Sequence, residues 1–266
     1  DKDFKGHDAA ALVDDTDRLI AHVVAEDKDV FRQLLTTNKS FVIYSKADAN
    51  QKKLEKEVQD FAKLKATDPK KAATKPDPAD PDRLACAAYG LTAYPPPSTQ
   101  PVALPKDQRA GVLTQPSWLV AYSENTDNHA IRRGKWVDAQ LPIAPHKTLR
   151  ERMEVTRADY CWQCHQRMNP VGLTFETFDH FGRWRATETV EDPTPKVDTK
   201  GKPLPPGLRQ VPYDSTGGIS GTKVPELDRD FPNAVALIHA VANTDRARQV
   251  FVRHAFRYYF GRNETL

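Results

Sequence analysis

The sequence predicts a mainly α-helical protein, and three observations support this fold class. Several segments place apolar side chains three and four residues apart, which is the spacing of one helix face. Strand-like alternation of apolar and polar residues is scarce, and no internal repeat is visible. The chain contains 21 prolines against 12 glycines, and the prolines gather in stretches that we expect to form long irregular loops.

The N-terminal part is expected to begin with two helices. The first starts after Asp8, a residue suited to capping, and places apolar residues from Leu12 to Val24 near helical spacing. A second, short helix is expected over residues 27–35. The polar segment 46–65 is expected to form an exposed amphipathic helix, because its apolar residues also recur at helical spacing: Leu54, Val58, Phe61 and Leu64.

Residues 66–107 differ in composition because they are rich in proline. We expect loop and extended chain there, interrupted by a short helix around residues 84–89. This stretch is the best candidate for a domain boundary. We therefore divide the chain into a helical N-terminal domain with a proline-rich linker, residues 1–106, and a second domain, residues 107–266.

The second domain returns to the helical pattern. Its last helix is well marked, because Asn243 or Thr244 can cap its start and Gly261 can end it. One apolar stripe follows this helix, formed by Val250, Phe251, Ala255, Phe256 and Tyr259. The expected elements are helices over residues 112–122, 131–141, 148–157 and 245–259 and a loop over residues 192–225.

The composition argues against several classes of protein. The 39 basic and 36 acidic residues give a formal net charge of +3, and the two kinds are interleaved, which argues against a nucleic-acid-binding protein. No apolar run approaches the roughly 20 residues that a membrane-spanning helix needs. The polar start shows no signal peptide, although a mature chain or an excised piece would look the same. Three cysteines are too few for a disulfide-stapled scaffold.

One short motif carries recognisable chemistry. Cys161-Trp162-Gln163-Cys164-His165 has the C-x-x-C-H pattern of covalent haem attachment. On a helix, residues three apart lie on one face, with about 5–6 Å between their Cβ atoms. Two thiols at that spacing can add to the two vinyl groups of one porphyrin, and the imidazole of His165 can bind the iron. The sequence therefore predicts one covalent haem c with His165 as its proximal ligand.

Three alternatives stay open from the motif alone. A structural zinc site needs four ligands, and only Cys86 is left to add to the pair. A redox-active C-x-x-C pair favours a βαβ setting, which the surrounding pattern does not indicate. The third alternative is a plain disulfide or a chance occurrence. Cys86 itself lies in an apolar, helix-like stretch and is expected to be a buried free thiol.

A longer pattern surrounds the motif: Cys161-x-x-Cys164-His165-x-x-Met168-Asn169-Pro170-x-Gly172, then Glu176-x-x-Asp179-x-x-Gly182-Arg183-x-Arg185. This pattern resembles a haem-binding domain of unknown function found in large secreted cytochrome-like proteins of planctomycetes, myxobacteria and their relatives. Further segments resemble stretches of the same multidomain family, and these are residues 109–119, 133–137, 148–152 and 256–262.

The resemblance implies export, because c-type haem is attached outside the cytoplasm, and hence a periplasmic, cell-surface or secreted location. It also allows the chain to be part of a larger multidomain protein. From about residue 147 the layout resembles a small cytochrome c, in which a backbone carbonyl, here expected between Pro170 and Gly172, orients the proximal imidazole. We hypothesise that Arg183 and Arg185 contact the haem propionates, with a plain surface position as the alternative for each.

The second axial ligand is not evident from the sequence. Met168 lies only three residues after His165, and Met153 precedes the motif, so neither reaches the opposite face of a porphyrin easily. The remaining donors are His180, His239 and His254. His239 follows the long loop and is the candidate distal ligand, whereas His254 suits a core or surface position.

Three functions are consistent with this pattern. A six-coordinate iron would make the chain a one-electron carrier, which is the function that we favour. An open sixth position would allow peroxidase-like chemistry or the binding of a small ligand. A domain that only retains haem for an interaction is the third. The carboxylate pairs Asp14/Asp15 and Glu176/Asp179 are expected to be solvated or capping residues, and no redox partner is identifiable.

Overall fold

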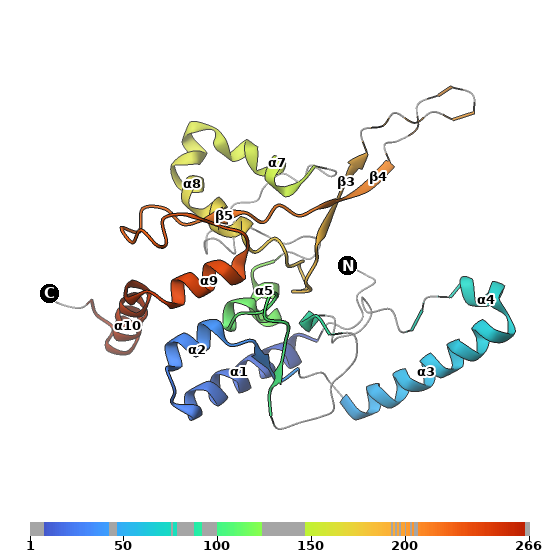
Figure 1. Cartoon of the computed structure of the whole chain (residues 1–266), viewed down its shortest axis with the longest axis horizontal. Helices are drawn as coiled ribbons and strands as arrows, with labels where there is room; N and C mark the ends of the chain where they lie inside the picture. Colours follow the sequence, from blue (N-terminus) through green and yellow to red (C-terminus); the bar gives the residue numbers. More distant parts are fainter. Residues whose placement is uncertain are drawn as a thin grey trace.

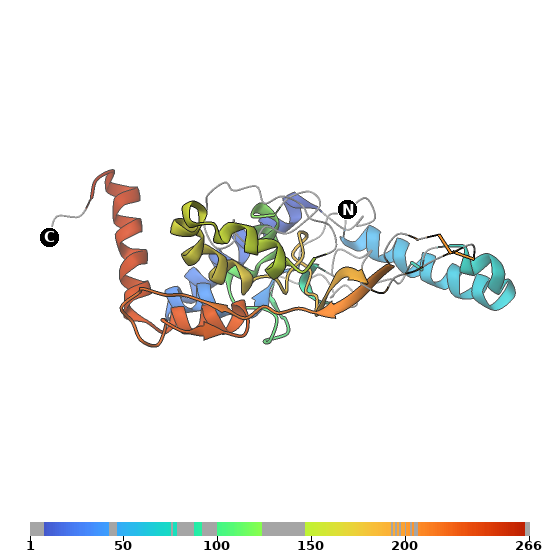
Figure 2. The same ribbon diagram turned by 90° about the horizontal axis from the view of Figure 1, so that it is seen from above.

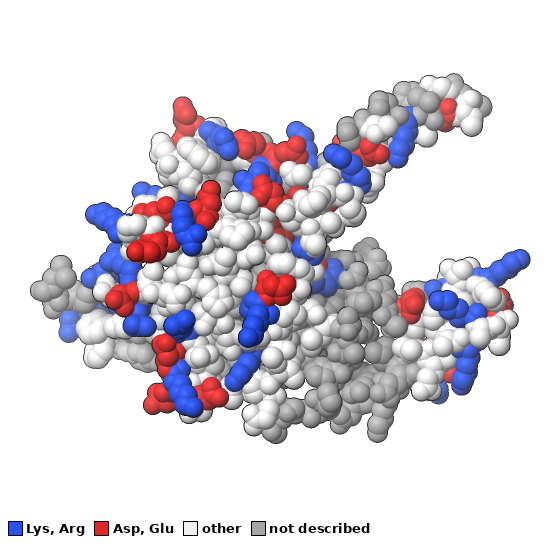
Figure 3. All heavy atoms as spheres, in the orientation of Figure 1, with Lys and Arg blue, Asp and Glu red and all other residues white. Residues whose placement is uncertain are grey.

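The computed structural model describes residues 8–42, 47–75, 77–78, 88–91, 100–123, 147–192, 194, 196, 198–199, 201–202, 204 and 207–263. Within this part, helices make up most of the regular structure, and three small two-stranded antiparallel sheets accompany them (Figure 1). On the face drawn in Figure 3, acidic and basic side chains are interspersed, as the near-balanced composition leads one to expect. None of the described helices is long and apolar enough to cross a membrane.

The two helices predicted at the start of the chain are confirmed. Helix α1 spans Ala9–Glu26, and Asp8 caps it by accepting a hydrogen bond from the backbone N–H of Ala11 at 3.1 Å. Helix α2 spans Val30–Thr36. The turn between them is tight because Asp27, at φ 46°, adopts the left-handed conformation that ends α1.

The polar segment predicted as an amphipathic helix is also helical. Helix α3 covers Ala47–Thr67 and is followed by the short helix α4, Pro69–Ala73. Both lie together at one end of the molecule in Figures 1 and 2. The short helix predicted around residues 84–89 falls almost entirely outside the described residues, as does Cys86.

The middle of the described chain contains a short strand, a 3₁₀ turn and a helix. Strand β2, Val102–Ala103, pairs antiparallel with β1, Lys39–Ser40. The helical signal predicted over residues 112–122 forms a 3₁₀ turn, η3 (Val112–Thr114), and then helix α5 (Pro116–Ala121), because Pro116 suits the first turn of a new helix. The helix predicted over residues 131–141 lies outside the described residues.

The charged segment predicted as a short helix is confirmed as α7, Leu149–Met153, continued by the 3₁₀ turn η4, Glu154–Arg157. A capping box begins α7: the Thr148 side chain accepts from the backbone N–H of Glu151, and the Glu151 carboxylate accepts from the backbone N–H of Thr148. Helix α8, Asp159–Leu173, follows directly and contains the C-x-x-C-H motif.

The loop predicted over residues 192–225 is partly wrong, because it contains strands. Strand β3, Thr187–Asp192, pairs with β4, Gly207–Pro212, in a hairpin that extends from the body in Figure 1. Two shorter strands pair beside it, namely β5 (Gly217–Gly218) and β6 (Asp230–Phe231). On β3, only Glu188 and Val190 are buried, so one inward position is charged and the apolar alternation of a strand is missing from the sequence. The fold is therefore mixed rather than plainly α-helical, and the cytochrome-c-like arrangement stays a prediction.

Two helices end the described chain. Helix α9, Ala234–Ala242, is mostly buried. Helix α10, Asp245–Phe260, confirms the predicted last helix: Thr244 caps it by accepting from the backbone N–H of Ala247 at 3.3 Å, and Gly261, at φ 62°, ends it. None of the residues of α10 is buried, and the helix stands away from the body in Figure 2.

One hydrophobic core combines residues from both predicted domains. Its buried members are Ala110, Leu119, Phe175, Phe178, Ala234, Val235 and Ile238, and Leu35 of α2 packs against them. A second cluster contains Leu12, Val42, Ala88, Tyr89 and Leu104. Packing thus crosses the predicted boundary between residues 106 and 107, which itself stays a prediction.

Candidate functional site

The haem-attachment motif lies on the first turns of α8, as the sequence predicted. Helix α8 begins after Ala158, whose φ of −55° and ψ of 138° are not helical. The backbone N–H of Trp162 donates to the Ala158 carbonyl at 2.8 Å. Asp159 in the first turn interacts favourably with the positive end of the helix dipole. The motif is therefore held on a regular helical scaffold.

The two cysteines of the motif are free thiols that solvent can reach. Cys164 is exposed and Cys161 is partly exposed. Because they are three residues apart on α8, their side chains lie on one side of the helix, one turn apart. His165, next to Cys164, is buried, with 9% of its surface exposed.

The imidazole of His165 is held by a side chain of its own helix. Its Nδ1 lies 3.0 Å from the Oδ1 of Asn169, one turn further along α8, and both residues are buried. Because the amide oxygen can only accept, Nδ1 must carry the hydrogen in this pair. In the neutral imidazole this hydrogen bond selects the tautomer with its lone pair on Nε2, which is the form that can bind a metal.

This arrangement differs from the backbone carbonyl predicted within Pro170 to Gly172. Helix α8 continues through that segment, so the carbonyls of Val171 and Gly172 accept from the N–H groups of Thr174 and Phe175. The Pro170 carbonyl is covered by Gly217 of β5, where the Cβ of any larger residue would overlap the oxygen. The acceptor for the imidazole is instead the Asn169 side chain, whose position four residues after His165 is the available sequence signal.

A cleft of about 360 Å³ lies beside the motif, on the face of α8 that carries Trp162 and Asn169. The Arg157 guanidinium lies over the Trp162 ring at 5.6 Å from its centroid, and Arg150 pairs with Asp214 at 2.8 Å across the cleft. The residues lining it are Arg150, Met153, Glu154, Arg157, Trp162, Asn169, Pro170, Leu173, Asp214, Thr216, Gly217 and Asp230. The cleft combines an apolar wall with charges of both signs.

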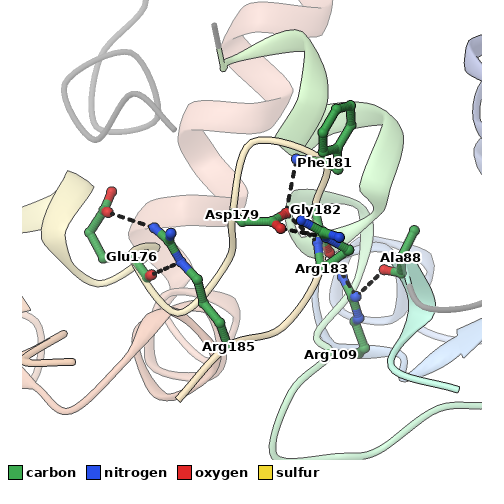
Figure 4. Close-up of polar contacts among 8 residues, drawn as sticks. All are labelled: Ala88, Arg109, Glu176, Asp179, Phe181, Gly182, Arg183 and Arg185. Carbon is green, nitrogen blue, oxygen red and sulfur yellow. Dashed lines mark hydrogen bonds and ion pairs between the residues drawn. The ribbon is translucent and has the colours of Figure 1, made fainter. Parts of the chain in front are cut away.

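The loop after α8 contains the two arginines predicted to meet haem propionates. The Arg183 Nε donates to the Asp179 Oδ2 at 2.5 Å, and the Arg185 guanidinium lies 3.6 Å from the Glu176 carboxylate (Figure 4). Both arginines thus have carboxylate partners within the loop, and Arg183 is largely buried rather than on the surface. Their contact with propionates stays a prediction.

The expectation that the acidic pairs are solvated or capping residues holds only in part, because three of the four residues are not solvated. Asp15, Glu176 and Asp179 are buried, whereas Asp14 is partly exposed and pairs with Arg18 at 3.1 Å. Asp179 accepts from the backbone N–H groups of Phe181 and Arg183, both at 2.9 Å, so it also fixes the turn of the loop. A carboxylate becomes tolerable in the interior when N–H and O–H donors surround it in this way.

Arg109 is the principal residue whose role the sequence does not indicate. Its guanidinium is buried and donates to the backbone carbonyls of Ala88 and of Gly182 (2.9 Å), as Figure 4 shows. It also donates to the Thr114 carbonyl at 2.6 Å and lies over the Phe178 ring. Burial lowers its pKa to about 10, so it stays charged at neutral pH. It joins three distant segments of the chain, although arginine normally indicates a surface position.

His180, His239 and His254 are not among the residues that line the cleft beside α8, whereas Met153 is. His239 is exposed on α9 and lines another cleft, of about 510 Å³, with Arg109 and residues of α2. His180 lies in the loop after α8 with its ring 4.3 Å from that of Phe181, and His254 is exposed on α10. Met153 and Met168 are both buried. The distal ligand therefore stays a prediction, and within the described residues no group of three or more His, Cys, Asp or Glu side chains is placed to hold a metal ion.

Comparison with known proteins adds one finding. Residues 141–188 match a family model described as PSCyt3, a protein of unknown function (DUF1588). The matched segment contains α7, α8, the loop with Arg183 and Arg185, and the start of β3. The family name points to a cytochrome-like domain, while its description states no function. No curated protein and no solved structure matches the chain.

Proposed function

We propose that this protein is a c-type cytochrome that carries one haem and transfers single electrons outside the cytoplasm. The observation that carries the proposal is the arrangement on α8: two reachable thiols three residues apart, and beside them a buried imidazole whose Nδ1 is hydrogen-bonded to Asn169. The match of residues 141–188 to a cytochrome-named family supports it.

The donor set fits haem c. Covalent attachment needs two thiols that the vinyl groups can reach, and Cys161 and Cys164 are at least partly exposed. Iron ligation needs a neutral imidazole with one nitrogen available, and the hydrogen bond from Nδ1 to Asn169 leaves the lone pair on Nε2 of His165. When bound, haem supplies one-electron chemistry between ferric and ferrous iron.

The remaining residues around the motif orient and support this donor set. Asn169 fixes the ring of His165 and increases the basicity of its Nε2, since a hydrogen bond from the opposite ring nitrogen makes the imidazole a stronger donor. Gly217 lets β5 approach the Pro170 carbonyl closely, which anchors the C-terminal half of α8. Export follows as part of the proposal, because covalent attachment takes place outside the cytoplasm.

The decisive experiment is expression of the full chain in a host that attaches c-type haem. We expect a denatured protein band that retains haem and a pyridine haemochrome spectrum with one haem per chain. Cys161→Ala with Cys164→Ala should remove the bound haem completely, because no thioether can form. The matched control is Cys86→Ala, which changes the third cysteine of the chain and should leave haem content unchanged.

A wild-type protein without bound haem, with both motif thiols still open to alkylation, would contradict the proposal. Electron transfer has its own test: the visible spectrum of the reduced protein should be low-spin and unchanged by carbon monoxide. Rapid binding of carbon monoxide would instead favour an open iron site and the peroxidase-like alternative.

A further inference from the structure

Helix α10 presents an apolar surface that the described chain leaves largely uncovered. Val252, Tyr259 and Phe260 expose 60%, 80% and 64% of their surface, although residues of these types are normally buried. The helix is fixed near its start, where the Phe251 ring packs 5.3 Å from that of Phe31, and Arg248 pairs with Asp29 at 3.9 Å. Beyond this contact α10 stands away from the body in Figure 2.

Val252, Tyr259 and Phe260 form one face together with the partly buried Phe256, whereas Tyr258, which exposes 83% of its surface, lies on another side of the helix. Val252, Phe256, Tyr259 and Phe260 are spaced by four, three and one residues, which places them along a single stripe of a helix. The rings of Phe256 and Phe260 stack at 4.6 Å, so the stripe is a continuous aromatic surface.

Basic residues flank this stripe. Residues 245–262 contain five arginines against one aspartate, a formal net charge of +4, and all five arginines are exposed. Arg246, Arg253 and Arg257 are spaced by seven and four residues, so they share a face beside the aromatic stripe. The helix thus combines an apolar face, rich in aromatic residues, with a basic one.

We propose that α10 binds flat on the surface of an anionic lipid bilayer. Its aromatic stripe would enter the boundary between headgroups and acyl chains, and its arginines would contact lipid phosphates, which a guanidinium can bind through two hydrogen bonds. Charge favours this occupant over a second copy of the chain, because two α10 helices would bring +4 against +4. Lying on a membrane needs no spanning helix, so the proposal is consistent with the described helices.

The test is sedimentation of the full chain with vesicles of phosphatidylcholine alone and of phosphatidylcholine mixed with phosphatidylglycerol. We expect binding to the mixed vesicles to be about tenfold or more tighter, and to weaken as salt is raised, because both effects follow from headgroup charge. Val252→Ser with Tyr259→Ser should reduce this binding about tenfold or more, because it removes the apolar face and leaves the charge unchanged. Arg246→Gln with Arg253→Gln should remove most of the preference for anionic lipid.

The matched control is Lys53→Gln with Lys63→Gln on α3, which removes the same charge from another exposed helix and should leave binding unchanged. Circular dichroism of each variant checks that it is folded. Equal binding to both kinds of vesicle, or none to either, would overturn the proposal. A concentration-dependent dimer in the wild type that Val252→Ser with Tyr259→Ser abolishes would overturn it too, by assigning the face to a second copy.

Discussion

The first turns of α8 and the loop that follows the same helix use polar side chains in opposite ways. On α8 the motif cysteine Cys164 is exposed and Cys161 is partly exposed. In the loop, Glu176 and Asp179 are almost completely buried, and both face arginines (Figure 4). The two regions are neighbours in the sequence, yet the first leaves its two thiols accessible and the second encloses its carboxylates.

The comparison distinguishes residues that react with a cofactor from residues that stabilise the fold. A group that must react with a cofactor has to be reachable, so changing it costs little folding energy. A buried charge has to be satisfied by its surroundings, so removing one partner leaves the others without compensation. We therefore expect substitutions in the enclosed network to act on stability, and substitutions around the motif to act on haem.

The largest expected effect is at Arg109. Arg109→Met removes the guanidinium that Ala88, Thr114 and Gly182 share and leaves three carbonyls without this donor. We expect the free energy of unfolding to fall by about 3–5 kcal/mol, since each unsatisfied buried polar group costs about 1–3 kcal/mol. Urea denaturation followed by circular dichroism measures this change.

Arg18→Met is the matched control, because Arg18 is exposed and forms an i,i+4 ion pair with the partly exposed Asp14. Its effect should stay below about 1 kcal/mol, as for other surface ion pairs. Equal decreases in the free energy of unfolding for the two substitutions would show that the buried network contributes no more to stability than a surface ion pair does.

A smaller effect, which depends on pH, is expected at Asp15. Its carboxylate accepts from Ser40 Oγ at 2.5 Å and from the backbone N–H of Phe41 at 2.6 Å, but burial outweighs these bonds and raises its pKa above the usual 3.8. The folded state therefore holds this proton more tightly than the unfolded state does. Stability contributed by the protonated form is present below pH 3.8 and is lost as pH rises through the raised folded pKa.

Asp15→Asn cannot ionise, so its stability should fall less than that of the wild type as pH rises through the raised pKa of Asp15. Denaturation curves at a series of pH values from about 3 to 7 measure the slope. Asp14→Asn changes the partly exposed neighbour and should keep the wild-type slope. If Asp15→Asn keeps the wild-type dependence of stability on pH, a group other than Asp15 causes that dependence.

The same contrast explains how much the sequence could predict. Helices α1 and α10 were predictable because caps and apolar spacing are local signals, as Asp8 and Gly261 illustrate. The β3–β4 hairpin was not predictable from the sequence. The charged residue Glu188 occupies a buried position on β3, so the apolar alternation that marks a strand is missing. The motif residues of α8 could be named from spacing alone, whereas the burial of Asp15 and Arg109 depends on contacts between distant segments, to which no local pattern corresponds.

The smallest effect on stability that we predict, and the most specific effect on chemistry, concerns Asn169. Asn169→Leu removes the acceptor for the His165 Nδ1 and should lower the free energy of unfolding by about 1–2 kcal/mol, the cost of a lost buried hydrogen bond. In the haem-bearing protein, the weaker imidazole should stabilise ferric iron less, so the reduction potential should rise, and external imidazole or cyanide should displace His165 at about tenfold lower concentration. Potentiometric titration and ligand titration measure the two changes.

Asn169→Asp keeps an acceptor oxygen at this place and should restore the resistance to external ligands, which a merely structural role for Asn169 does not require. If Asn169→Leu retains its haem and has the wild-type potential and ligand resistance, then Asn169 does not position the imidazole. Absence of haem from the wild-type protein would instead reject the cytochrome proposal.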